Sequence, residues 1–247
     1  MFPVITFVSY LVLTCRGSAL SPAPLVKLTS RRGIVCPVFR DEEGFLSEFV
    51  AYYQLHGMTH IRFYDDGSSD NSSSEIEPWI ESGFVTVVNA TALLAERLTS
   101  NSKKTSRWIK LLLKQTSERN TVQRVCELDC KEYAVKNKFD FYFSLDIDEY
   151  MLPVAEGVTL MDAIATAVQD TQQSIFLVQK YNFAATPHLL EPVHQLTIEA
   201  YQTRMLTRFS MTYFKSVATK ILLHLTNENL TKRQLRFLIY CCHFHNC

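Results

Sequence analysis

Glycine and net charge are both scarce in this sequence, and each scarcity argues against a class of function. The chain has 7 glycines among its 247 residues, and residues 34–43 contain none. A nucleotidyltransferase uses glycines after the first strand to hold phosphates, so that enzyme class is disfavoured. The 25 basic and 25 acidic residues cancel, which leaves no electrostatic footprint for nucleic acid. The sequence also has no fixed-period repeat and no low-complexity tract.

The rest of the composition is that of a globular protein. Apolar residues make up 47% and charged residues 20% of the chain, so it can bury a core and is not disordered. A length of 247 residues fits one large domain or two small ones. We expect one α/β domain over residues 33–217, followed by a divergent tail over residues 218–247.

The N-terminus begins with an uncharged stretch over residues 2–15, which contains the apolar run VITFVSYLVLTC. This run is short for a membrane span but fits the apolar region of a secretory signal, with cleavage near Ala19. Residues 1–19 are therefore predicted as a signal peptide or a short signal-anchor, and residues 20–32 as a linker. A buried N-terminal segment is the remaining alternative. The first interpretation places the protein in the secretory pathway, either Golgi or membrane-associated through the N-terminus, or secreted.

Six cysteines remain if the chain is cleaved near Ala19. An even number is compatible with an oxidising compartment, although the pairing cannot be read from the sequence. Asn71, Asn89 and Asn229 each begin an N-x-Ser/Thr sequon. The last seven residues, CCHFHNC, contain soft ligands, but adjacent cysteines lack the usual C-x-x-C spacing of zinc sites. We therefore favour a divergent tail over a zinc site.

Residues 139–153, FDFYFSLDIDEYMLP, are the stretch around which the chain is organised. An apolar segment over residues 139–144 predicts a buried parallel strand, and Asp146, Asp148 and Glu149 follow directly. Carboxylates this close repel one another, and a bound cation would relieve the repulsion. Asp-x-Asp places two carboxylates on the same side of an extended segment, where Asp146 and Asp148 could bind magnesium or manganese. A solvated acidic turn is the alternative.

A strand–helix–strand unit is predicted earlier in the chain. It consists of a strand over residues 33–39, a helix from an Asp41 N-cap to about His56, and a strand over residues 60–64, with Gly57 ending the helix. The acidic stretch DDGSSDNS follows over residues 65–72. Open α/β sheets bind ligands at the carboxyl ends of their strands, so this stretch is a candidate site. An Asx-rich turn without a ligand is the alternative.

The remaining segments are predicted mainly as scaffold. We expect helices over residues 74–82, 108–137 and 159–169, strands over residues 84–88 and 175–178, and a basic loop over residues 101–107. Cys126 and Cys130 lie one turn apart on the long helix. No histidine lies near them in the sequence, so they are predicted as core or disulfide residues rather than metal ligands.

Taken together, the two acidic motifs resemble those of glycosyltransferase family 92 and of family 2-like enzymes. The first family motif runs from Arg-Asn-Glu through Glu-Trp, Tyr-His and Gly to Tyr-Asp-Asn-x-Ser-x-Asp. Its matches here are Arg40-Asp41-Glu42, Glu48-Phe49, Tyr52-Tyr53, Gly57 and residues 64–70. The second motif, Asp-Ile-Asp-Glu followed by an aromatic residue, is matched by residues 146–150. Weaker matches follow at residues 182–188, 198–201 and 215–217.

The resemblance implies a GT-A fold, which is a Rossmann-like α/β domain with a mostly parallel twisted sheet flanked by helices. It implies transfer, in an inverting reaction, of a sugar from a UDP-sugar such as UDP-galactose to a glycan or glycoconjugate acceptor. Asp146 and Asp148 would bind Mn²⁺ or Mg²⁺, and Asp65 would lie near the nucleobase. The donor-binding candidates are Arg40, Glu42, Asp65, Asp66, Asp70, Asp146 and Lys215. Candidates for the catalytic base are Glu191, Glu199 and His188.

Several positions depart from the family pattern. Asp41 replaces the family asparagine, Phe49 the tryptophan, Tyr53 the histidine and Ala184 a glycine. The tail lacks the proline that follows the Lys-Ser motif and a histidine at the spacing that would complete the metal site. Three hypotheses follow: a metal-dependent glycosyltransferase, an inactive GT-A-like binding protein, and the disfavoured nucleotidyltransferase.

Overall fold

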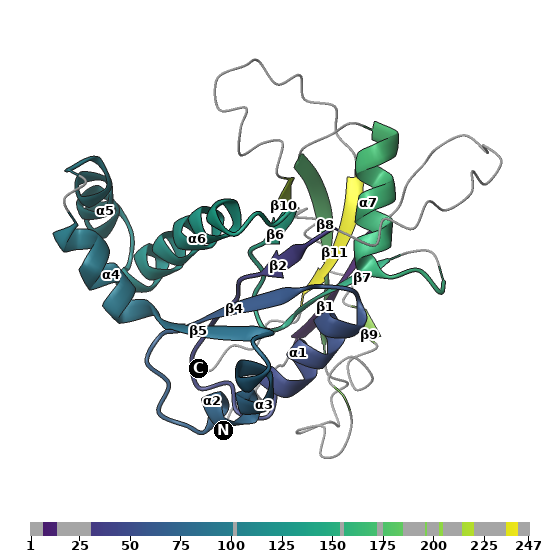
Figure 1. The fold of residues 1–247 in the computed structure, drawn as a ribbon, viewed down its shortest axis with the longest axis horizontal. Helices are drawn as coiled ribbons and strands as arrows, with labels where there is room; N and C mark the ends of the chain where they lie inside the picture. The colour runs from purple at the N-terminus through teal and green to yellow at the C-terminus, as the bar shows by residue number, and fades with distance from the viewer. Residues whose placement is uncertain are drawn as a thin grey trace. The chain divides into compact units, whose positions relative to one another are not determined.

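The structure, a computed structural model, describes residues 7–13, 31–100, 103–153, 156–171, 175–184, 196, 203–204, 214–219 and 236–241 (Figure 1). Contacts divide the chain into two compact units. We call residues 32–54 and 58–147 the parallel-sheet unit, and residues 1–31, 55–57 and 148–247 the mixed-sheet unit. The predicted domain limits stay a prediction.

The sheet of the parallel-sheet unit is built from parallel pairings. Its described strands are β2 (Gly33–Val35), β3 (Val38–Phe39), β4 (His60–Asp65), β5 (Val85–Asn89) and β6 (Phe141–Phe143). β2 and β3 follow one edge of β4, β5 pairs with the other edge, and β6 pairs with β2. The predicted strand–helix–strand unit is confirmed.

The strand predicted over residues 33–39 is interrupted at Cys36 and Pro37. Pro37 has no N–H group for a ladder hydrogen bond. Its carbonyl accepts a hydrogen bond from the Tyr64 N–H at 2.9 Å, and the Cys36 N–H donates to the Phe143 carbonyl at 2.8 Å. The segment therefore forms two short strands along the same edge of β4.

The helices of this unit differ from the prediction in their limits. They are α1 (Leu46–Leu55), α2 (Ser72–Glu75), α3 (Glu77–Glu81), α4 (Ala90–Thr99), α5 (Lys103–Gln115) and α6 (Glu118–Lys136). The prediction of Asp41 as a helix N-cap is wrong. Asp41 and Gly44 have φ angles of 53° and 93°, which a right-handed helix does not permit, and α1 begins only at Leu46.

Two further helix predictions are wrong in this unit. The basic loop predicted over residues 101–107 is helical from Lys103. The long helix predicted over residues 108–137 is two helices, because the Ser117 side chain caps α6 by accepting the Asn120 N–H at 3.3 Å. Helix α4 was not predicted from the sequence; it begins where the side chain of Asn89 accepts the Ala92 N–H at 2.8 Å.

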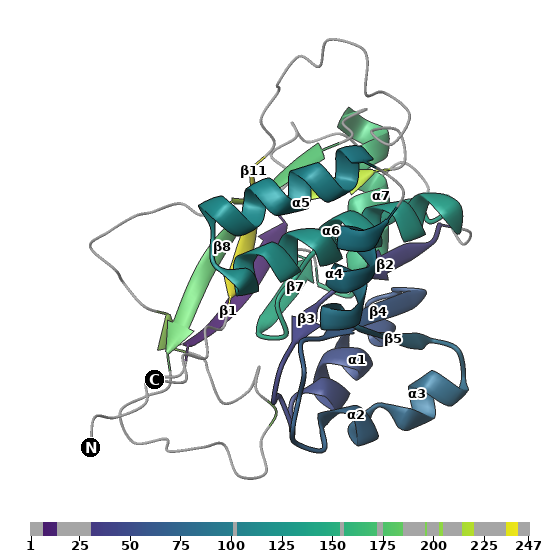
Figure 2. The ribbon, with the colours of Figure 1, turned by 90° about the vertical axis from the view of Figure 1, so that its left-hand side faces the viewer.

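Strand β4 determines the layers on its two faces, because successive side chains of a strand point to opposite sides. Phe63 packs against Phe49 of α1, with ring centroids 6.0 Å apart. Arg62 and Tyr64 point the other way and reach Asp129 of α6. Figure 2 shows α1 and α6 on the two sides of β4. These layers confirm the predicted α/β fold, in which helices flank a mostly parallel sheet.

The carboxylate of Asp129 joins three elements of the parallel-sheet unit. Its Oδ2 accepts hydrogen bonds from Arg62 Nη2 at 2.9 Å and from the Tyr64 hydroxyl at 2.8 Å, and its Oδ1 accepts one from Arg97 Nη2 at 2.8 Å. Burial alone would raise the pKa of Asp129, but the hydrogen bonds from these three side chains outweigh it and lower the pKa. β4, α4 and α6 are therefore held by one ionised group.

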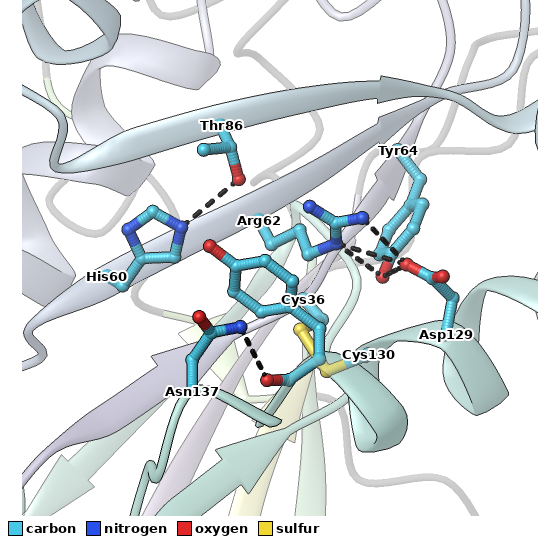
Figure 3. The surroundings of a disulfide bond; sticks show 9 residues. Cys36, His60, Arg62, Tyr64, Thr86, Asp129, Cys130 and Asn137 are labelled. Atoms are coloured by element: carbon cyan, nitrogen blue, oxygen red, sulfur yellow. Dashed lines mark hydrogen bonds and ion pairs between the residues drawn. A yellow bond between two sulfur atoms is a disulfide. The ribbon is translucent and has the colours of Figure 1, made fainter. Parts of the chain in front are cut away.

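A disulfide lies beside this network, as Figure 3 shows. It joins Cys36, at the end of β2, to Cys130 of α6, and the two cysteines are 94 residues apart in the sequence. Cys126, one turn earlier on α6, is a buried free thiol, and burial raises its pKa to about 12. A thiol with so high a pKa is protonated and unreactive at neutral pH. The prediction of core or disulfide cysteines is confirmed.

The mixed-sheet unit has both parallel and antiparallel pairings. Its described elements are β1 (Phe7–Leu13), β7 (Glu149–Pro153), α7 (Leu160–Thr171), β8 (Ile175–Ala184), β9 (Thr203–Arg204), β10 (Phe214–Thr219) and β11 (Arg236–Cys241). β1 is parallel to β7, and β8 is parallel to β11 but antiparallel to β9 and β10. The predicted helix over residues 159–169 and strand over residues 175–178 are confirmed.

The predicted signal segment contains β1, and its cleavage stays a prediction. Among the helices that the structure describes, none combines the length and the apolar character needed to cross a bilayer.

The chain passes close to α7 at Gly57. Gly57 has a φ of +84°, and a Cβ there would lie 3.2 Å from the Cβ of Met161. His56 caps α7, since its Nδ1 accepts the Leu160 N–H at 3.3 Å and its carbonyl accepts the Met161 N–H at 3.2 Å. Burial lowers the pKa of His56, which keeps Nδ1 available as an acceptor.

Asp129→Ala should lower the free energy of unfolding by about 3 kcal/mol, because it leaves two largely buried guanidinium groups without their carboxylate. Urea denaturation followed by circular dichroism measures this change. Glu127→Ala is a matched control on α6, because its partner Arg124 has a side chain that is 64% exposed. This control substitution should lower the free energy of unfolding by less than about 1 kcal/mol. Equal losses in the two variants would contradict the role assigned to Asp129.

Removing the disulfide with Cys36→Ala and Cys130→Ala should lower the free energy of unfolding by about 2–4 kcal/mol. Dithiothreitol should destabilise the wild type by a similar amount and should affect the double variant much less. Cys126→Ala should keep the response of the wild type to dithiothreitol. A double variant as sensitive to the reductant as the wild type would disprove the pairing.

Candidate functional site

Hydrogen bonds join the loop after β3 to the segment after β4. Four consecutive N–H groups of residues 41–44 donate to side-chain oxygens of residues 68–75, and we call this set the two-loop ladder. The first three bonds are 2.9–3.1 Å long. The pairs are Asp41 with Ser68, Glu42 with Ser72, Glu43 with Asp70, and Gly44 with Glu75. The two loops that carry the first family motif are therefore joined in space, although helix α1 and strand β4 lie between them in the sequence.

The side chain of Asp41 adds hydrogen bonds to the two-loop ladder, in which it accepts from the segment after β4. Its Oδ1 accepts hydrogen bonds from the Ser69 N–H at 2.6 Å and from the Ser69 hydroxyl at 3.1 Å. The bond from the Ser69 N–H lowers the pKa of Asp41. The positive φ of Asp41 also explains the residue type, because asparagine and aspartate tolerate this conformation better than other side chains. Asp41, like the family asparagine that it replaces, is a residue type that tolerates this backbone conformation.

Two predicted donor-binding acids also hold these loops. Asp65 Oδ1 accepts the N–H groups of Gly67 at 3.0 Å and Ser68 at 2.7 Å, which is an Asx turn. Asp70 accepts from Ser72 at one oxygen and from the Glu43 N–H at the other. Burial alone would raise the pKa of Asp70, but these hydrogen bonds lower it. Contact of Asp65 or Asp70 with a donor stays a prediction, and both have a role in shaping the loops.

Three further carboxyl groups follow the ends of parallel strands. Glu42 follows β3, Asp66 follows β4 and Asp146 follows β6, and we call them the acidic cluster. Burial, with repulsion from Asp70 and other acids including Asp146, raises the pKa of Glu42 to about 7. Burial also raises the pKa of Asp66. Because the strands are parallel, their carboxyl ends lie at one edge of the sheet, where open α/β sheets bind ligands.

Two arginines oppose the charge of the acidic cluster. Attraction from Arg40 and Arg119 lowers the pKa of Asp66 and so opposes the effect of burial, and Arg119 does the same for Glu42. Arg40 was a predicted donor-binding residue and its side chain is 62% exposed. Arg119 was not among the predicted site residues, because it falls inside the long helix predicted over residues 108–137. The signal for it was Ser117 followed by Glu118, which is a helix start, so that Arg119 lies in the first turn of α6.

The predicted metal ligands differ in exposure. Asp146 is half-buried, whereas Asp148 is 7% exposed and the adjacent Glu149 is fully buried. Within the described residues, no group of three or more His, Cys, Asp or Glu side chains is arranged to hold a metal ion. The acidic cluster nevertheless fits a divalent cation in its residue types, because Asp146 repels the carboxylate of Glu42 and a bound cation would relieve that repulsion. Carboxylate oxygens are the ligands that Mn²⁺ and Mg²⁺ prefer.

Several predicted residues lie outside the described residues. These are the three candidates for the catalytic base, His188, Glu191 and Glu199, and the tail segment around His224. Lys215 lies in β10, of which only the backbone is described. Their roles stay predictions.

One of three comparisons with known proteins, a protein-family model, agrees with the two motifs. The model of glycosyltransferase family 92 matches residues 35–229, which is more than half of the chain. No curated protein matches the chain. A solved structure described as the crystal structure of S. aureus TarS 1-349 is 17% identical, with a TM-score of 0.33. The match covers 59% of this chain and 34% of that one, so the chain spans about a third of the length of that structure. The match over residues 35–229 confirms the resemblance read from the acidic motifs, and the chain belongs to glycosyltransferase family 92.

Proposed function

We propose that this chain is a metal-dependent glycosyltransferase that moves a sugar from a UDP-sugar to a glycan acceptor. The observation that supports this proposal most directly is the acidic cluster at the carboxyl ends of parallel strands, with Arg40 and Arg119 beside it. Acids alone would repel a diphosphate, whereas acids with a divalent cation attract one. The family assignment provides the reaction class, and UDP-galactose is the first donor to test.

In this proposal Asp146 and Asp148 hold Mn²⁺ or Mg²⁺. A cation held there would supply Lewis acidity, which would stabilise a nucleoside diphosphate as the leaving group. Arg40 and Arg119 add fixed positive charge near the phosphates. Glu191, Glu199 or His188 removes the proton from the acceptor hydroxyl, on the face opposite the leaving group, as an inverting transfer requires.

A location in the secretory pathway is part of the same proposal. The disulfide between Cys36 and Cys130 supports it, since disulfides form and persist in oxidising compartments. The predicted N-terminal signal points to the same compartment. If this segment is a signal-anchor, the protein would be associated with the membrane through its N-terminus.

An inactive binding protein of the same fold is the second candidate. The sequence of the tail favours it, because residues 218–247 lack a proline and a histidine at the positions typical of the family. The two functions predict the same binding of UDP and differ in whether the sugar of the donor is released. Hydrolysis or transfer from a panel of UDP-sugars therefore distinguishes them.

Asp148→Asn should abolish the metal-dependent binding of UDP while leaving cooperative unfolding intact. In the wild type, Mn²⁺ and UDP together should raise the melting temperature, because a ligand that binds only the native state stabilises it by about 2.7 kcal/mol at 100 times its Kd. Neither component alone should produce this shift. Glu81→Gln, at an exposed position, is the matched control and should behave as the wild type. Undiminished UDP affinity of Asp148→Asn with Mn²⁺ would disprove the metal assignment.

Glu42→Gln should change how the stability of the ligand-free protein depends on pH. The pKa of Glu42 is raised from 4.5 to about 7 in the folded chain, so the folded state binds this proton more tightly than the unfolded state. Stability from this group is therefore lost as the pH rises from about 4.5 to about 7. Glutamine cannot ionise, so the variant should be more stable than the wild type at pH 8, by about 2 kcal/mol after allowance for solvent screening.

Urea denaturation from pH 4.5 to 8, with a chelator present, tests this second prediction. Glu81→Gln, at an exposed position, should show the pH dependence of the wild type. An unchanged slope in Glu42→Gln would show that this carboxyl group has no raised pKa.

A further inference from the structure

Helix α5 concentrates positive charge in a chain that is neutral overall. The chain has 25 basic and 25 acidic residues. The 13 residues of α5, KKTSRWIKLLLKQ, contain basic residues at five positions and no acid. The positive charge of α5 is therefore not balanced by any ion pair within the helix.

One face of α5 is fixed against the rest of the parallel-sheet unit. Ile109 is fully buried, and the hydroxyl of Ser106 donates to the Leu98 carbonyl of α4 at 2.8 Å. Figures 1 and 2 show α5 as the outermost helix of the α4–α6 layer, beyond α4 and α6 when seen from β4. The opposite face of α5 is therefore directed away from the core of this unit.

The exposed face combines a cationic stripe with apolar side chains. Arg107, Lys110 and Lys114 follow one another at helical spacing and are all exposed. Within the described part of the chain, no acidic group pairs with them. Trp108 is 38% exposed and Leu111 is 47% exposed beside this stripe. The described residues that line a surface hollow of about 460 Å³ are Ser106, Arg107, Lys110, Leu111 and Lys114.

We propose that this face of α5 binds the surface of an anionic lipid bilayer. Charge complementarity accounts for the cationic stripe, because acidic headgroups attract lysine and arginine. A soluble polyanion would neutralise the same cations but would leave Trp108 and Leu111 in water. A bilayer interface accommodates the basic and the apolar side chains together. Indole rings and leucines insert among the headgroups, while basic side chains stay at the phosphates. The helix is about 20 Å long and would lie in the plane of the interface.

Flotation of the full chain with lipid vesicles tests the proposal. The chain should bind vesicles of phosphatidylcholine mixed with phosphatidylserine more tightly than vesicles of phosphatidylcholine alone, and added salt should weaken the difference. Lys110→Gln with Lys114→Gln should weaken binding to the acidic vesicles about 30-fold, which corresponds to about 1 kcal/mol for each charge. All variants share the N-terminal apolar run, so a difference between them reports on α5.

Matched controls separate a local site from a change in net charge. Lys131→Gln with Lys136→Gln removes two positive charges from α6 and should change the affinity by no more than a few-fold. Leu111→Gln should weaken binding, whereas Val135→Gln, at a similarly exposed position of α6, should not. Equal effects of the α5 and α6 lysine variants would overturn the proposal.

Tryptophan fluorescence gives a second measurement. The chain has 2 tryptophans, so Trp79→Phe leaves Trp108 as the reporter. Its emission should shift to shorter wavelength, and an aqueous quencher should reach it less well, when acidic vesicles are added. No shift, equal binding to both vesicle types, binding to heparin without binding to vesicles, or self-association that the α5 substitutions abolish would each overturn the proposal.

Discussion

The ion pairs of Asp129 are the interaction on which the parallel-sheet unit depends most. Two guanidinium groups and a tyrosine hydroxyl from β4 and α4 converge on one carboxylate of α6. A charge buried at this depth without a partner would be costly, so each charged group of the network is stabilised by the presence of the others. This interdependence fixes the position of α6 along β4. It thereby fixes Arg119 at the start of α6, near the carboxyl ends of the strands.

The acids of the candidate site fall into two groups that the protein treats in opposite ways. Asp41 and Asp70 receive N–H and hydroxyl hydrogen bonds, and their pKa values are lowered. Glu42 and Asp66 are partly buried, and their pKa values are raised. The first group gives the loops a defined shape, and the second group places carboxyl groups at the sheet edge where burial disfavours their ionisation. The proposed site for a metal and a diphosphate would use both groups, because its shape must persist when the charge of the carboxylates is neutralised.

The sequence was sufficient for the strands of the parallel sheet and for the cysteines of α6, because buried strands and helical spacing leave a periodic pattern. It was insufficient where a single side chain determines where a helix or strand begins or ends. The N–H-accepting Ser117 splits a predicted helix, Pro37 divides a predicted strand, and the left-handed Asp41 delays the start of α1. Arg119 was missed for the first of these reasons. The two-loop ladder could not be predicted either, because its pairs are 27–31 residues apart in the sequence and no local pattern specifies them.

The neighbouring cysteines of α6 have a consequence for how the protein acquires its disulfide. Cys126 and Cys130 lie on the same side of the helix, so both can approach Cys36 while the chain is still folding. Pairing with Cys126 would displace α6 along its axis by four residues, or about 6 Å. That shift would carry Asp129 away from Arg62 and Arg97 and leave buried charges unmatched. The ion pairs of Asp129 therefore favour the register of α6 in which Cys130, and not Cys126, meets Cys36.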